Sequence, residues 1–297
     1  MNGNSGIINY GGQTKVSQSA VGHGATVNVP ATRKKADKGN ARRADVGVIT
    51  VVPEEARAVR RVLGLERVGN GGSPFSVGTV NVRGMDIHVA AIHALVQGQR
   101  SAVMAFENMR RRHHPAVIVF VGIGGGINRD IVIGDVAVAT QVIYYDLRKE
   151  TPEETLRRGD SKPVPAVIGN AVNAFFTDYG EPAAFTSEDD GGTGRDYRVF
   201  NGPIGSGDTV IANAESEIIR YLRRFNDKVL AVDMEAGGLT QAFHEQDGPH
   251  IVQGWAVIRG ISDTAGSDKN DEYHRVAAHH AALTLRELLP YLVIHRG

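Results

Sequence analysis

The sequence has no cysteine among its 297 residues, which excludes disulfides, thiol nucleophiles and zinc–thiolate sites and fits a reducing compartment. It also has no net charge, because 33 basic residues oppose 33 acidic ones, so the bulk composition favours neither nucleic acid nor an acidic partner. No apolar run is long enough to span a bilayer, and the N-terminus lacks the basic start and apolar core of a signal peptide. We therefore expect a soluble cytoplasmic protein that binds neither membrane nor nucleic acid.

The first 44 residues differ in composition from the rest of the chain. The segment INYGGQTKVSQSAVGHGATV combines β-branched residues, Asn and Gln with little charge, and a basic linker follows it. Such a segment can stack in register as cross-β structure, or it can be a disordered Gly/Ser-rich tail. We divide the chain into a tail with its linker over residues 1–44 and a folded domain over residues 45–297.

From residue 45 onward, apolar strands alternate with amphipathic helices. The continuous apolar run at 46–52 and the apolar segment at 116–122 indicate strands that are covered on both faces, and 254–263 is expected to be the last, buried strand. Helical spacing follows over 53–65, and a long helix is expected over 271–292. Further strands are expected in 75–92 (two strands turning near Arg83–Gly84), 135–146, 202–212 and 229–233, and further helices in 101–112, 165–179, 215–225 and from about residue 235. This alternation predicts an α/β fold with a mixed central sheet flanked by helices.

Candidate site residues fall at or just beyond the ends of four of these strands. They are Glu55, the glycine-rich loop 122–126, the pair Asp233 and Glu235, and Asp263. Ligands in such folds bind beyond the carboxyl ends of the strands. Each group also has a local interpretation: Glu55 can complement a helix dipole, the glycines can form a tight turn, and the aspartates can cap helices or turns. The glycine loop is neither a good dinucleotide fingerprint nor a phosphate loop, and the sequence indicates no metal and no cofactor.

Five ordered segments carry a resemblance to a known family: VGVITVVPEEARAV, VFVGIGGGINRDIVIGDVAVAT, GSGDTVIAN, AVDMEAGGL and VIRGISD. Together they resemble the motifs of the purine nucleoside phosphorylase and nucleosidase superfamily. They are most similar to its 5′-methylthioadenosine/S-adenosylhomocysteine nucleosidase branch. The resemblance covers about residues 45–292 and implies an N-glycosidase that acts on a small purine nucleoside or nucleotide.

The resemblance implies a role for each of three acids. Glu55 matches the acid that activates the attacking water, and Glu235, beside Met234, matches the residue that holds the ribose hydroxyls. Asp263 matches the acid that contacts the purine and helps to protonate the departing base. Asp233 is expected to serve structure or a helix cap. The resemblance also places five residues against the base and sugar: Gly124, Gly125, Val210, Ile211 and Ser262.

Two positions depart from the family pattern. Val210 replaces a residue that is often aromatic, so stacking on the base is weaker or supplied elsewhere. Ile123 replaces a residue that often carries a hydroxyl, which changes the polar contacts of the glycine loop.

Three activities stay open at this point. Glu55 would repel inorganic phosphate and suits a water, which favours hydrolysis, and Asp263 favours adenine. Arg100 is a candidate phosphate-binding residue, which keeps a phosphorolytic purine nucleoside phosphorylase as the alternative. The third hypothesis is a non-catalytic nucleoside-binding assembly module.

The substrate and the partners also stay open. Methylthioadenosine, S-adenosylhomocysteine, adenosine, AMP and ATP are all candidates. The segments 147–166 and 187–202 have two interpretations. They are either surface loops or segments that grip a 5′-phosphate chain through their basic residues: Arg148, Lys149, Arg157, Arg195 and Arg198. Relatives commonly form dimers or hexamers, so a homo-oligomer is expected. The tail resembles amyloid-type signalling motifs found beside nucleosidase effector domains in immune systems, which predicts a defence effector with a partner that carries a matching motif.

Overall fold

The computed structural model describes residues 43–69, 74–187, 195–265 and 273–294. The expected tail and almost all of its basic linker lie outside these residues, so the cross-β hypothesis does too. Within the described ranges, none of the helices has both the length and the apolar character that crossing a bilayer requires.

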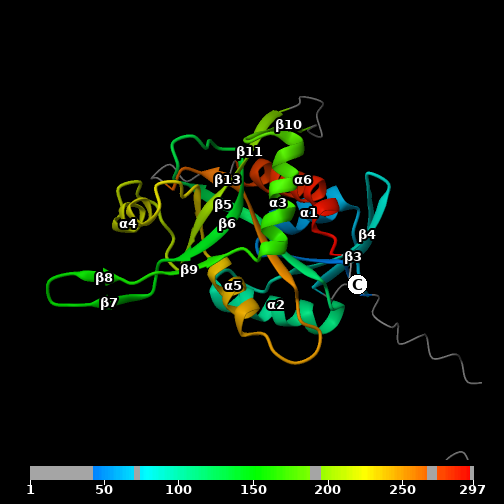
Figure 1. The fold of residues 1–297 in the computed structure, drawn as a ribbon, viewed down its shortest axis with the longest axis horizontal. Helices are drawn as coiled ribbons and strands as arrows, with labels where there is room; N and C mark the ends of the chain where they lie inside the picture. The colour runs from blue at the N-terminus through cyan, green and yellow to red at the C-terminus, as the bar shows by residue number, and fades with distance from the viewer. Residues whose placement is uncertain (1–42, 70–73, 188–194, 266–272, 295–297) are drawn as a thin grey trace, which may run out of the picture. The chain divides into compact units, whose positions relative to one another are not determined.

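The described residues form a mixed sheet of eleven strands, in agreement with the expected α/β fold (Figure 1). Its strands are β1 (Val46–Thr50), β2 (Glu66–Arg67), β3 (Phe75–Val82), β4 (Met85–His93), β5 (Val117–Gly126), β6 (Val136–Tyr144), β9 (Asp160–Pro163), β10 (Ala183–Ser187), β11 (Arg195–Ser206), β12 (Ala231–Asp233) and β13 (Gly254–Asp263). The order is β10-β11-β6-β13-β5-β1-β4-β3-β2, with β12 paired to β11 and β5, and β9 paired to β6. The expected hairpin turn is confirmed, because Arg83 and Gly84 both have positive φ angles, of 52° and 77°.

Helices cover both faces of this sheet, and each helix buries its apolar side against the strands. The helices are α1 (Pro53–Leu63), α2 (Gln99–His113), α3 (Ala166–Tyr179), α4 (Glu217–Phe225), α5 (Ala236–Glu245) and α6 (His274–Leu292). One apolar cluster packs α1, α3 and α6 against the sheet, and a second packs α2 and α5. A third cluster seats α4 near β12. Figure 1 shows α2 and α5 together, apart from α1, α3 and α6.

The central strands bring separate parts of the chain to one edge. Strands β13, β5 and β1 are adjacent and parallel, with Val117 facing both Val46 and Gly254. Their carboxyl ends therefore meet at the same edge of the sheet, which is where such folds bind ligands.

The glycine run was expected as a loop, and the structure corrects this expectation. Strand β5 continues through Gly126, because the short strand β12 pairs antiparallel with it at Gly125 and Gly126. This pairing joins positions about one hundred residues apart, so no local pattern announces it.

The segment 147–166 contributes a small separate hairpin of β7 (Arg148–Glu150) and β8 (Thr155–Arg157) before β9. Figure 1 shows this hairpin extending from the body of the domain at the left. Its position agrees with the surface-loop interpretation of this segment.

Candidate active site

A cavity of about 210 Å³ lies at the edge where β1, β5 and β13 end. Three acids from distant parts of the chain line it: Glu55 of α1, Glu235 before α5, and Asp263 at the end of β13. Their exposed fractions are only 3%, 7% and 8%. Five more of the predicted site residues line the same cavity: Gly124, Gly125, Val210, Met234 and Ser262.

Glu55 is fixed by the backbone at the junction between β1 and α1. Its Oε2 accepts hydrogen bonds from the Val51 and Val52 amides, at 2.7 and 3.0 Å, and its Oε1 accepts one from the Ile123 amide at 2.9 Å. Glu55 therefore lies in the first turn of α1, as the helix-dipole interpretation requires, and also lines the cavity. Burial raises the pKa of Glu55, while nearby Arg259 and the three amides oppose the rise.

Glu235 is held more loosely than Glu55. Its Oε1 accepts one backbone hydrogen bond, from the Gly98 amide at 3.1 Å, and its Oε2 lies 3.6 Å from the Arg259 guanidinium. Burial raises the pKa of Glu235 to about 7, with Arg259 opposing the rise and Asp233 adding to it. The carboxyl group therefore changes charge close to neutral pH.

Asp233 has the structural role that the sequence suggested. Its Oδ1 accepts from the amides of Glu235 and Ala236, at 3.2 and 3.1 Å, and so caps the start of α5. Its Oδ2 pairs with Arg259, whose Nε and Nη2 lie 2.8 and 2.6 Å away. This ion pair ties the end of β12 to the middle of β13.

Asp263 is oriented by its immediate neighbours. Its Oδ1 accepts from the Ala265 amide at 2.8 Å, as the Asx-turn interpretation requires. Its Oδ2 accepts from the Ser262 hydroxyl at 3.0 Å. Each carboxylate oxygen has further lone pairs, and the side chain still lines the cavity.

Arg259 contacts the acids Asp233 and Glu235 and was not singled out from the sequence, although it stands inside the quoted VIRGISD segment. Its side chain is fully buried and stacks on the ring of Phe120, with 4.1 Å between the guanidinium carbon and the ring centre. The one available signal was an arginine in the middle of a strand covered on both faces, which implies a buried partner. Sequence reasoning also missed Gln97 and His274, which line the cavity.

The glycine run leaves room for this charged cluster. A Cβ atom at Gly122 would collide with the Arg259 guanidinium and with the Glu55 carboxylate. At Gly124 it would lie 2.8 Å from the Val232 carbonyl oxygen, closer than Cβ atoms come to other atoms. The run therefore serves close packing of an extended strand, and not the turn that the sequence suggested.

Two predicted site residues do not reach the acidic cavity. Arg100 is exposed and lines a different cavity between α2, β6 and α5, because it leaves α2 on the side that faces those elements. Ile211 is 5% exposed and packs in the apolar cluster with Ile143 and Leu222. Its neighbour Val210 does line the cavity and is 57% exposed.

The basic residues proposed to grip a 5′-phosphate are not among the lining residues of the acidic cavity either. Arg157 pairs with Glu217 and donates to the Tyr145 carbonyl. Arg198 pairs with Asp135, at 2.7 Å. Both guanidinium groups therefore have structural partners. Among the described residues, no group of three His, Asp or Glu side chains is arranged to hold a metal ion.

Comparison with known proteins gives related sequences and folds. The family model described as the phosphorylase superfamily matches residues 45–290. The 5′-methylthioadenosine/S-adenosylhomocysteine nucleosidase of Mycobacterium bovis is 28% identical over 84% of this chain and 97% of its own length. The enzyme of the same name from Listeria innocua is 26% identical over 82% of this chain and 98% of its own length.

Solved structures share the fold. The same nucleosidase from Neisseria meningitidis, in complex with methylthio-immucillin-A, aligns with a TM-score of 0.59 and 21% identity over 82% of this chain and 97% of that one. Futalosine hydrolase of Helicobacter pylori aligns with a TM-score of 0.60 and 18% identity over 84% of this chain and 98% of that one. The sequence-based resemblance to the phosphorylase and nucleosidase group is thereby confirmed, and the chain belongs to the phosphorylase superfamily.

Proposed function

We propose that this protein is a hydrolase that cleaves the N-glycosidic bond between adenine and ribose in a small nucleoside. The observation that carries the proposal is the convergence of Glu55, Glu235 and Asp263 on one buried cavity. Relatives that match nearly their full length to this chain are named methylthioadenosine/S-adenosylhomocysteine nucleosidases, which supports the same reaction class.

In the proposed reaction the three acids act on different parts of one substrate. Breaking the bond from C1′ to the base nitrogen sends the electron pair to the base and leaves positive, oxocarbenium-like charge on the ribose. Asp263 delivers a proton to the departing base, and Glu55 removes a proton from the water that attacks C1′. Glu235 accepts the hydrogens of two ribose hydroxyls, a grip that requires its ionised form.

Arg259 has a positioning role in this proposal. Its guanidinium lies 3.6 Å from Glu235 and is fixed by its ion pair with Asp233. It also opposes the rise in the pKa of Glu55. A fixed positive charge behind the cavity lets several carboxylates stay close together without a metal ion between them.

The charge of the cavity favours water over phosphate as the nucleophile. Four carboxyl groups line the cavity, those of Glu55, Asp233, Glu235 and Asp263, and the negative charge of the ionised ones opposes the entry of an inorganic phosphate dianion. Arg100, which kept phosphorolysis open, lies in another cavity. We therefore propose hydrolysis, with the free sugar, which keeps its 5′ substituent, rather than its 1-phosphate as the second product.

The negative charge of the cavity also affects which 5′ group the substrate can carry. A phosphate chain would bring net negative charge towards the carboxyl groups, whereas a methylthio group carries no charge and a homocysteinyl group is a zwitterion with no net charge. We therefore propose methylthioadenosine or S-adenosylhomocysteine ahead of AMP and ATP. The relatives' names point the same way.

For residues 1–44 and for assembly, our proposals rest on the sequence pattern alone. We propose that the tail recruits a partner with a matching motif in a defence response, and that the chain forms a homo-oligomer. A chain that begins at residue 45 should then keep base release and lose recruitment. Loss of base release on truncation would contradict an independent recruiting role.

The test of the enzymatic proposal is chromatography of the products. The full-length protein is incubated with methylthioadenosine, S-adenosylhomocysteine, adenosine, AMP and ATP, each with and without inorganic phosphate. Free adenine from the thioethers without phosphate is the expected result. Release that requires phosphate and yields the 1-phosphate of the substrate's sugar would replace hydrolysis by phosphorolysis.

Variants connect the reaction to the site. Asp263→Asn should lower adenine release by roughly 10²–10⁴-fold, the size of a general-acid contribution. Asp227→Asn is the matched control, because Asp227 is exposed in the turn after α4. Full activity of Asp263→Asn, or nucleoside binding by the wild-type protein with no base released, would end the proposal.

A further inference from the structure

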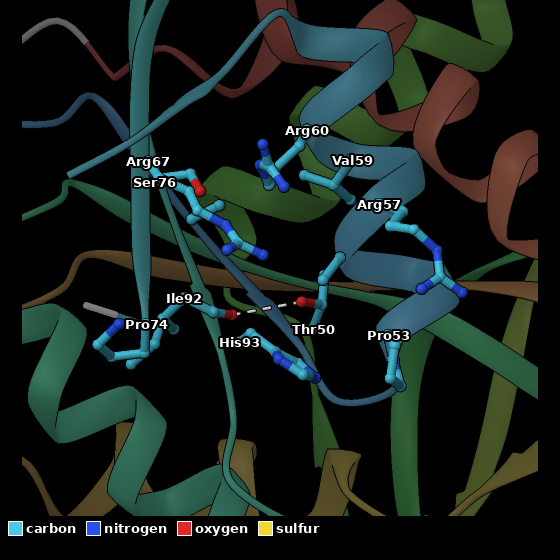
Figure 2. Close-up of a pocket in the computed structure, with 12 residues that line it drawn as sticks. Thr50, Pro53, Arg57, Val59, Arg60, Arg67, Pro74, Ser76, Ile92 and His93 are labelled. Atoms are coloured by element: carbon cyan, nitrogen blue, oxygen red, sulfur yellow. Dashed lines mark hydrogen bonds between the residues drawn. The ribbon is translucent and has the colours of Figure 1, made fainter. Parts of the chain in front are cut away.

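A second cavity, of about 360 Å³, lies on the other side of the turn that joins β1 to α1 (Figure 2). Helix α1 forms one wall, and strands β2, β3 and β4 form the other. Thr50 and Pro53 line this cavity, while Val51, Val52 and Glu55, from the same turn, line the acidic one. The volume falls within the ~300–1,000 Å³ that is typical of sites for small molecules.

The charged residues that line this second cavity are all basic. They are Arg57, Arg60 and Arg67, with His93 beside them, and no Asp or Glu appears among the lining residues. The positive charge of Arg57 is offset by its ion pair with Glu54. Figure 2 shows Arg60 and Arg67 reaching into the space between helix and strands, while Arg57 points away from them. Two guanidinium groups thus converge on one hollow without a protein carboxylate between them.

Arg60 lacks an acceptor for part of its guanidinium. Its Nε is buried, and none of the described residues accepts a hydrogen bond from it. Leaving a buried donor unpaired costs on the order of 1–3 kcal/mol, and more for a charged group, so such a group normally faces an acceptor. A phosphate oxygen satisfies a guanidinium well, because the planar fork matches two oxygens at once.

Neutral donors complete the lining of the cavity. Ser76 is 5% exposed, and its hydroxyl can donate to an anion. His93 stands at the floor, where its Nε2 donates to the Val51 carbonyl oxygen at 2.8 Å. The Val52 amide, which belongs to the same peptide unit as that carbonyl, donates to Glu55 Oε2 at 3.0 Å. One peptide unit therefore contacts both a lining residue of the basic cavity and the proposed catalytic base.

We propose that this cavity is a binding site for the phosphate group of a small phosphorylated molecule, held by Arg60, Arg67 and Ser76 and separate from the site of base release. Inorganic phosphate alone would fill only part of the volume, so the cavity also has room for the organic part of a phosphate monoester. The ligand chemistry is defined by the paired guanidinium groups, and it differs from the 5′ thioether group without net charge that we propose for the acidic cavity.

The experiment measures binding by calorimetry on the full-length protein at about 0.15 M ionic strength. Inorganic phosphate and glycerol 3-phosphate are the two ligands, and tighter binding of the second would identify a monoester as the ligand. The Arg60→Gln, Arg67→Gln double variant should weaken binding at least about tenfold, as expected from the loss of charged hydrogen bonds. Arg61→Gln, which removes the same charge from an exposed position of α1 outside the cavity, should bind as the wild type does.

Several outcomes would overturn the proposal. No saturable binding of either ligand at this salt concentration would do so, and so would an equal loss in the Arg61→Gln control, which indicates general attraction to a basic surface. The melting temperature without ligand shows whether the double variant folds. If it does not, Arg67→Gln alone is decisive, because Arg67 is exposed on β2. Product analysis keeps the two proposals apart: phosphate bound here leaves the free sugar as the product, whereas phosphorolysis yields the 1-phosphate of that sugar.

Discussion

Replacing Glu235 by Gln should make the protein more stable above neutral pH, and the size of the effect follows from the structure. Folding raises the pKa of this carboxyl from the ordinary 4.5 to about 7, mainly by burying it. Between these two values the native state binds the proton more tightly than the unfolded chain, so wild-type stability falls as the pH rises. At ~1.4 kcal/mol per pH unit, the interval corresponds to about 3 kcal/mol of stability lost by pH 8. The variant lacks this loss, and its amide oxygen can still accept from the Gly98 amide.

The assay is urea unfolding at pH 5 and at pH 8, followed by the fluorescence of Trp255, which is fully buried. The difference in unfolding free energy between Glu235→Gln and wild type should grow by about 2.5 kcal/mol in favour of the variant from pH 5 to pH 8. Glu245→Gln, which replaces an exposed carboxyl on α5, is the control, and its unfolding free energy should differ from that of the wild type by the same amount at both pH values. Parallel behaviour of Glu235→Gln and wild type at the two pH values would refute the reasoning.

Three further predictions follow from the same cluster. Glu55→Gln should lower adenine release by roughly 10²–10⁴-fold while calorimetry still detects nucleoside binding, and an unchanged rate would remove Glu55 from the reaction. Arg259→Met should cost about 3–5 kcal/mol in urea unfolding, because it leaves Asp233 buried without its partner, and a neutral result would show that the ion pair is dispensable. Gly122→Ala should cost about 1–3 kcal/mol by crowding the guanidinium and should also slow base release, whereas wild-type stability and rate would contradict the close packing there.

Much of the fold could be predicted from the sequence, because its central strands are continuous apolar runs. The prediction for 254–263 coincides with β13, and the turn at Arg83–Gly84 joins β3 to β4 as expected. The glycine run was misread because its pairing partner β12 lies far along the chain. Local glycine content indicates a turn, whereas here it reflects crowding by side chains from other strands.

The acids of the candidate site could be predicted from the sequence because of their positions in the strands, whereas Arg259 could not. Glu55, Glu235 and Asp263 stand at strand ends, and the ends of adjacent parallel strands meet wherever the sheet forms. Arg259 stands in mid-strand, and its partner Asp233 is visible only once β12 and β13 lie near each other. Arg100 was misplaced because proximity in sequence to Gly98 does not determine on which side of α2 a side chain emerges.

The proposed chemistry is carried by the ends of the sheet and the first turns of helices, whereas Val210 lies in the coil between β11 and α4. That coil joins strand β11 to helix α4, and the hydrogen bonds that hold Glu55 and Asp263 involve none of its residues. We expect redesign for new nucleosides to succeed there first. Because the coil that carries Val210 is separate from the elements that carry the reactive acids, the preferred substrate can change while those acids keep their positions.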